Sequence, residues 1–203
     1  MTSPRAPLGR LSLMMFLEYA VWGAWLPVAA RFLSAPAESG GLGFSPGQIG
    51  MILGVAASAG AILAPFIAGQ LADRLMNAER ALAGLLLLGG TVNWMLASQT
   101  SYSAWLWLSI VYSVLFMPTL ALTNSVAFAH VGDAGRDFPR VRVWGTIGWI
   151  AASWAFPMIY LQKDLAPQAM PPFLSGTEVE GATARLAEAL RFSGLLSLLL
   201  GLY

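Results

Sequence analysis

The stretch from residue 81 to residue 132 contains no Asp, Glu, Lys or Arg, and it constrains the fold of this chain more than any other feature. Since about 20 apolar residues cross a bilayer, an uncharged run of roughly 50 residues is too long for one membrane-spanning helix. It predicts two spans, with the polar cluster at residues 98–101 as the turn between them. Soluble domains carry about 25% charged residues, whereas this chain has 10%. We therefore expect an integral membrane protein.

Apolar runs in the rest of the chain extend this prediction to an all-α bundle of six transmembrane helices. The first run is too long for a signal peptide, and it contains Glu18 near its middle. The last run is shorter than a span and stops at Tyr203, so we expect a helix that is cut off. The predicted spans cover residues 11–30, 48–71, 81–97, 104–128, 142–161 and, incomplete, 189–203.

The distribution of basic residues predicts how the bundle is oriented. Six spans leave both ends of the chain on one side of the membrane. That side receives Arg5, Arg10, Arg74, Arg80, Arg136, Arg140 and Arg142, whereas the other receives Arg31, Lys163, Arg185 and, where the last apolar run begins, Arg191. Because cytoplasmic loops carry the excess of Lys and Arg, we expect a multi-pass protein of the cell (inner) membrane with a cytoplasmic N-terminus.

Composition also excludes several kinds of function. The formal net charge of +1 is too small to suggest binding of nucleic acid. The chain has no Cys, and its one histidine, His130, has no metal-ligating neighbours in the sequence. We therefore expect no metal and no cofactor. An enzyme needs a nucleophile, a base or metal ligands at one depth, and the sequence presents none, so a membrane-embedded enzyme or a scaffold is the less favoured alternative to a transporter.

The stretch from Asp137 to Ile150 changes from a charged loop to an apolar run and predicts two functional faces on one helix. Arg142, Thr146, Trp149 and Ser153 lie at offsets of four, seven and eleven, so they share a face that suits a polar, flat ligand. Another face of this helix has small residues, which let a neighbouring helix approach closely. They are Gly145, Gly148 and Ala152. The alternative for Arg142 is a side chain that snorkels to the membrane interface.

Glu18 is the only acidic residue inside a predicted span. A carboxylate at such a position costs about 2.5–3.5 kcal/mol on insertion scales, and it usually marks function. We interpret Glu18 as a proton acceptor or a ligand for a sugar hydroxyl; the alternative is a protonated carboxyl bonded to a neighbouring helix. Trp22 and Trp25 lie on the same helical face, where they either stack on a flat base or serve packing. In the second span, Gly50, Gly54 and Ser58 predict a ridge for tight helix packing.

Several motifs resemble those of a known family. The turn at residues 69–74, GQLADR, resembles the loop between the second and third helices of the major facilitator superfamily. Three further segments resemble signatures of the nucleoside:proton symporters within that superfamily. They are FLEY with WGAW at residues 16–25, MPTLALTN at residues 117–124, and DFP with RVWGTIG at residues 137–148.

This resemblance implies a fold, a function and site residues. The family fold has twelve helices in two halves, so the chain corresponds to the N-terminal half, and the missing C-terminal half supplies further contacts. The implied function is proton-coupled uptake of nucleosides by alternating access, with sugars or other polar metabolites as the alternative substrates. We expect the 203-residue piece alone to transport nothing. The implied roles are substrate binding for Arg142, Thr146 and Trp149, and gating for Asp73 and Arg74.

Asn124 is a further candidate for substrate binding, although a hydrogen bond between helices explains it equally well. The expected partners are thus a nucleoside or sugar, protons and the lipid bilayer.

Overall fold

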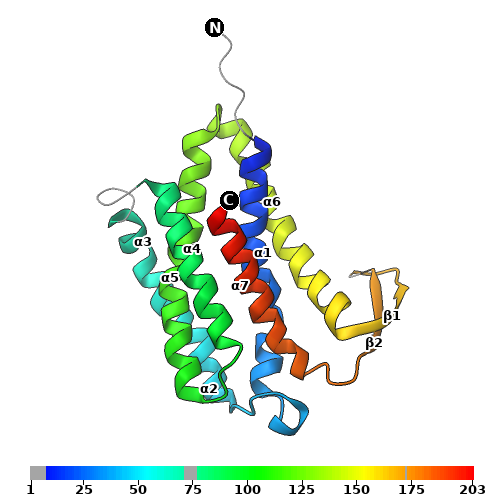
Figure 1. Ribbon diagram of the computed structural model, residues 1–203. Helices are drawn as coiled ribbons and strands as arrows, with labels where there is room; N and C mark the ends of the chain where they lie inside the picture. The colour runs from blue at the N-terminus through cyan, green and yellow to red at the C-terminus, as the bar shows by residue number, and fades with distance from the viewer. Residues whose placement is uncertain (1–7, 71–76, 172) are drawn as a thin grey trace.

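The computed structural model describes residues 8–70, 77–171 and 173–203, and within them six long helical segments form an elongated bundle (Figure 1). The second segment is continuous and passes from α2 through the π-helical η2 into α3. The six segments are α1 (Leu8–Ser34), α2–η2–α3 (Pro46–Gly50, Met51–Ala56 and Ala57–Gln70), α4 (Ala78–Leu96), α5 (Tyr102–His130), α6 (Ala134–Phe156) and α7 (Ala187–Leu202).

Three of these segments are long and apolar enough to cross a membrane by themselves, namely α1, the segment Pro46–Gln70 and α5. The other three have physical reasons to fall short. Glu79 and Arg80 stand in the first turn of α4, and α6 begins among charged residues. The described part of α7 has 16 residues.

Polar caps set where several helices begin. Ser45 forms a capping box with Gln48 at the start of α2, and the Ser101 side chain accepts from the Ala104 N–H at the start of α5. Asp133 accepts from two backbone N–H groups at the start of α6. Because of this cap, α6 begins at Ala134, well before the residue 142 at which the sequence predicts a span to begin.

Helices that are distant in sequence lie side by side in the bundle. α1 packs most extensively on α6, α4 packs on α7, and α3 packs on α5. α7 also lies against α1 (Figure 1). Consequently α1, α4, α5 and α7 together surround the buried residues at the centre of the bundle.

The contact between α1 and α6 depends on glycines on both helices. A Cβ atom at Gly148 would lie 2.1 Å from the Phe16 carbonyl oxygen, and one at Gly23 would lie 2.6 Å from the Trp149 carbonyl oxygen. Gly145, Gly148 and Ala152 are all buried, so the small-residue face predicted for α6 is confirmed. Main chains in such close contact leave no room for a side chain.

Pro27 lies inside α1 beside this contact. A proline has no N–H, so the carbonyl oxygen of Gly23, four residues earlier, loses its helical donor. The Ser153 hydroxyl of α6 lies 3.2 Å from this oxygen and 2.7 Å from the Trp149 oxygen of its own helix. A hydroxyl donates one hydrogen bond at a time, so Ser153 serves the two carbonyls alternately. Ser153 therefore faces the α1 main chain.

We expect Gly148→Ala in the full-length protein to disrupt the α1–α6 contact. Main chains on both sides oppose the added methyl group, so the cost is at or above the usual range for overpacking, about 1–3 kcal/mol. Thermal unfolding in detergent measures this loss. Gly84→Ala is the matched control, because no atom lies within 4 Å of a Cβ at Gly84 in α4. Equal unfolding temperatures for the two variants would contradict the tight contact.

The small-residue ridge predicted in the second segment is wrong for the described residues. No atom lies within 4 Å of a Cβ added at Gly50 or Gly54. Ser58 is exposed, and its hydroxyl donates to the Gly54 carbonyl of its own helix. The residue that packs tightly is Gly60, where a Cβ would lie 2.0 Å from the Ser113 hydroxyl oxygen of α5. The rotation of the helix about its axis turns the ridge away from α5.

Between α6 and α7 the expected polar loop contains an antiparallel hairpin, β1 (Gln162–Pro167) with β2 (Leu174–Glu178), beside the end of α6 (Figure 1). Arg31, near the end of α1, forms two hydrogen bonds with the Glu178 carboxylate, at 2.6 and 2.8 Å. These bonds lower the pKa of Glu178 below its usual value. Both side chains are about half exposed, so solvent screens this pair and it contributes little to stability.

Candidate substrate and proton site

Arg142 lies on an aromatic ring of the neighbouring helix. Its guanidinium carbon is 4.3 Å from the centre of the Tyr19 ring of α1, a cation–π contact. Gly145, one turn further along α6, leaves the space, since a Cβ there would lie 2.7 Å from the Tyr19 ring and 2.8 Å from the Arg142 guanidinium. Arg142 is half-buried by this contact. The structure therefore directs Arg142 along the protein surface toward α1.

Two tryptophans continue this surface. The rings of Trp149 on α6 and Trp22 on α1 pack edge to face, with centroids 5.2 Å apart and an interplanar angle of 82°. Both residues are half-buried, and Thr146, between Arg142 and Trp149, is exposed. The structure thus brings together Arg142, Thr146, Trp149 and Trp22. We call this group, with Tyr19, the α1–α6 face.

Tyr19 is the member of this face that the sequence analysis missed. Its position three residues before Trp22 places both rings on one side of α1, and this spacing was the available signal. The spacing does not reveal that α6 brings a guanidinium onto the Tyr19 ring.

Glu18 lies in the centre of the bundle and is fully buried. The Thr119 hydroxyl oxygen of α5 is 2.6 Å from Glu18 Oε1 and 2.5 Å from the Phe116 carbonyl oxygen. One hydroxyl cannot donate to both oxygens. The Glu18 carboxyl, the Thr119 hydroxyl and the Phe116 carbonyl all form a hydrogen bond when Glu18 carries a proton. Glu18 then donates a hydrogen bond to Thr119, and Thr119 donates one to the Phe116 carbonyl. The second carboxyl oxygen, Oε2, has no hydrogen-bond partner among the described residues.

Two further predicted residues, Trp25 and Asn124, lie apart from the α1–α6 face. Trp25 is buried and packs edge to face on Tyr112 of α5, with centroids 5.7 Å apart. Asn124 on α5 is half-buried, and its Oδ1 has no hydrogen-bond partner among the described residues. Asp73 and Arg74 lie outside the described residues.

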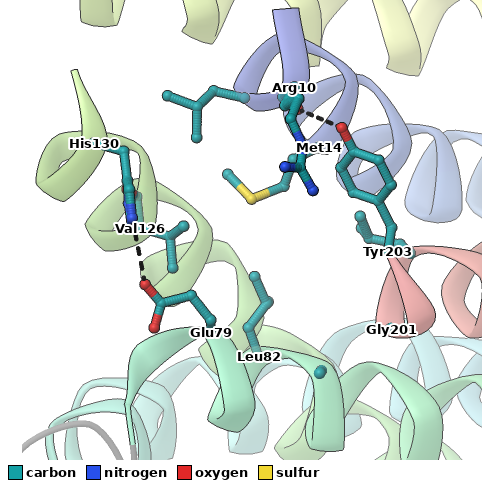
Figure 2. Close-up of a pocket in the computed structure, with 11 residues that line it drawn as sticks. Arg10, Met14, Glu79, Leu82, Val126, His130, Gly201 and Tyr203 are labelled. Atoms are coloured by element: carbon teal, nitrogen blue, oxygen red, sulfur yellow. Dashed lines mark hydrogen bonds and ion pairs between the residues drawn. The ribbon is translucent and has the colours of Figure 1, made fainter. Parts of the chain in front are cut away.

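A small cavity adjoins the site, and a larger one lies away from it. One of about 90 Å³ lies between α1, η2 and α5 and is lined by Trp22, Trp25 and Tyr112. A second, of about 280 Å³, lies where α1 begins (Figure 2), and none of the predicted site residues lines it. There Glu79 and His130 approach to 3.8 Å. The described residues contain no group of three or more His, Cys, Asp or Glu that could hold a metal ion.

Comparison with known proteins identifies relatives of this chain. The family model described as "Nucleoside H+ symporter" matches residues 8–178. The putative nucleoside transporter YegT of Escherichia coli K12 is 43% identical over 165 residues, which cover 80% of this chain and 37% of the relative. The nucleoside permease NupG of the same organism is 31% identical over 71% of this chain and 34% of the relative. The chain thus spans little more than a third of these relatives, which are transport proteins and not enzymes.

A solved structure agrees with these relatives. The crystal structure of the nucleoside transporter NupG superposes with a TM-score of 0.77 and 25% identity, over 96% of this chain and 42% of that chain. The six helical segments therefore have the arrangement of a membrane transporter fold.

Proposed function

Because the chain belongs to the nucleoside H+ symporter family, we propose that it is the N-terminal half of a twelve-helix transporter that couples nucleoside uptake to protons by alternating access. The observation that carries this proposal is the α1–α6 face, where a cation and three aromatic rings lie beside an exposed hydroxyl. In this proposal the protein lies in the inner membrane with its N-terminus in the cytoplasm, as the distribution of basic residues favours.

The chemistry of the α1–α6 face suits a nucleoside. A nucleoside combines a flat base, whose faces pack on aromatic rings, with hydroxyl and carbonyl groups that accept hydrogen bonds. Trp149 and Trp22 offer aromatic surface, and the Arg142 guanidinium offers several N–H donors. Thr146 is exposed between them and can donate or accept. The C-terminal half supplies the opposite wall and further polar contacts.

Glu18 suits the role of the proton carrier. It is fully buried, and both its hydrogen bond with Thr119 and the bond from Thr119 to the Phe116 carbonyl are satisfied when Glu18 is protonated. Tyr19 follows Glu18 in sequence and lies under Arg142, so the proposed proton carrier and the proposed substrate face share one turn of α1.

The test of this proposal is uptake of radiolabelled uridine, adenosine and a hexose by the full-length protein in a host that lacks nucleoside uptake. We expect saturable uptake of a nucleoside that increases when the external pH is lowered, and no uptake of the hexose. Binding measured with purified protein should show the same order of preference. Hexose uptake without nucleoside uptake would assign the face to sugars, and uptake that ignores the proton gradient would refute coupling.

A further inference from the structure

A second set of polar groups lies inside the bundle and does not belong to the proposed substrate face. Three polar atoms on three different helices are buried and have no hydrogen-bond partner among the described residues. They are Trp25 Nε1 on α1, Asn93 Oδ1 on α4 and the Tyr112 hydroxyl oxygen on α5. Buried polar atoms without partners are rare in folded proteins, and ordered water usually satisfies them.

Ser193 of α7 connects these groups. The Asn93 amide donates to the Ser193 hydroxyl at 2.8 Å, and Ser193 donates to the Val21 carbonyl of α1 at 2.6 Å. The Tyr112 side chain lies beside Trp25 and Ser193. Four helices therefore direct polar groups to one place. We call Trp25, Asn93, Tyr112 and Ser193 the inner polar seam.

A cavity adjoins one end of the inner polar seam. Trp25 and Tyr112 both line the cavity of about 90 Å³ between α1, η2 and α5. One water molecule needs roughly 10–15 Å³ of such space and two to four polar partners, so the cavity has room for several molecules. The unpaired Tyr112 hydroxyl and Trp25 indole N–H belong to two of the residues that line this cavity, and both atoms are themselves buried.

The other end of the seam approaches Glu18. Val21 and Trp25 follow Glu18 on the same face of α1, and Tyr112 lies on the face of α5 that carries Thr119. Seven residues along a helix correspond to about 10 Å, which a few water molecules span. The second oxygen of Glu18 has no partner, so it can accept a bond from such a water.

We propose that the inner polar seam is the hydrated route by which protons reach Glu18, and that this route runs through the interior of the bundle and meets the nucleoside-binding face at Trp22, which lines the same cavity. This inference rests on the proposed role of Glu18 as the proton carrier. A proton that arrives from the cavity binds a water or hydroxyl oxygen, which passes its own proton onward, so only the Glu18 carboxylate is changed at the end. Most of the side chains that surround Glu18 along this route carry no charge.

Those groups can be named helix by helix. α1 contributes the neighbouring Tyr19, and α6 contributes Arg142 across the Tyr19 ring. α5 contributes the hydroxyl groups of Thr119, Thr123 and Tyr112. α4 and α7 contribute only the Asn93 amide and the Ser193 hydroxyl at this place among the described residues. The one fully charged side chain among these groups is therefore Arg142, which lies on the opposite side of Tyr19.

The test uses Tyr112→Phe and Ser193→Ala in the full-length protein, reconstituted in liposomes that contain a pH-sensitive dye. Each change removes one hydroxyl and leaves the rest of the side chain. We expect nucleoside-dependent proton entry to slow on the order of tenfold, less than for loss of a positioned acid or base, because water replaces the hydroxyl in part. Counterflow exchange of labelled nucleoside, which needs no net proton movement, is the internal reference.

Ser197→Ala is the matched control. Ser197 is also a buried serine of α7, and its hydroxyl also donates to a backbone oxygen of a neighbouring helix, that of Leu86. No hydrogen bond joins its side chain to a member of the inner polar seam among the described residues. Proton entry should remain normal in this variant. An equal slowing in Ser197→Ala would show that packing explains the effect, and the route would be rejected.

Comparison with Glu18→Gln separates failure of the route from failure of the proposed function. If Glu18→Gln abolishes proton entry while Tyr112→Phe and Ser193→Ala preserve its normal rate, Glu18 carries the proton but receives it by another path. If Glu18→Gln itself preserves proton entry, the proposed coupling role is wrong and the seam has no acceptor. Should one seam variant fail to fold, the other gives the same answer.

Discussion

Glu18→Gln in the full-length protein is expected to abolish pH-driven accumulation of nucleoside while counterflow exchange largely continues. Glutamine keeps the shape of the protonated carboxyl group and still donates to Thr119, whose oxygen is 2.6 Å from Glu18 Oε1. It cannot release a proton, so the transporter stays in the equivalent of its protonated state. Exchange of nucleoside needs no change in that state, whereas accumulation against a gradient does.

The measurement is accumulation of labelled nucleoside in vesicles with and without an imposed pH gradient. Glu79→Gln is the matched control, because it removes a carboxylate that lies at the start of α4 and is half exposed. This control should accumulate nucleoside normally. Accumulation by Glu18→Gln at the normal level would assign coupling to residues outside this chain.

Arg142→Lys is expected to weaken nucleoside binding nearly as much as Arg142→Ala. Loss of a hydrogen bond to a charged group costs about 1.5–3 kcal/mol, which corresponds to roughly ten- to a hundred-fold in affinity. Lysine preserves the charge and a contact with the Tyr19 ring, but it cannot reproduce the planar fork of N–H donors. The two variants therefore separate the hydrogen-bonding geometry of Arg142 from its charge.

Equilibrium binding to purified, folded full-length protein measures this effect. Arg191→Lys is the control, because Arg191 pairs with Glu188 on α7 and lies outside the proposed face. An interface anchor would behave differently, since lysine snorkels as well as arginine does. Normal affinity in Arg142→Lys, together with an insertion defect in Arg142→Ala, would show that Arg142 anchors the helix at the membrane interface.

Particular residues show how far the sequence predicted the candidate site. Glu18 stands out in the sequence because it is the only acidic residue in a predicted span, and the structure buries it completely. Helical spacing and the family resemblance predict Arg142 and Trp149 as substrate-binding residues, and in the structure they lie on one face with Trp22. The sequence could not separate Trp22 from Trp25, which are three residues apart on one helical face. The neighbours of each ring separate them, since Trp149 contacts Trp22 and Tyr112 contacts Trp25.

Sequence alone determined that this chain is a membrane protein made of helices, because a long run without charge has no other stable environment. It also determined that α6 has a smooth face, because small residues at helical spacing allow close approach whatever helix lies opposite. Only the tertiary structure decided which helix that is, and so which groups meet. The guanidinium of Arg142 on Tyr19 and the bond between Asn93 and Ser193 join residues far apart in the chain. Periodicity describes one helix at a time, whereas these contacts depend on how each helix is rotated against its neighbours.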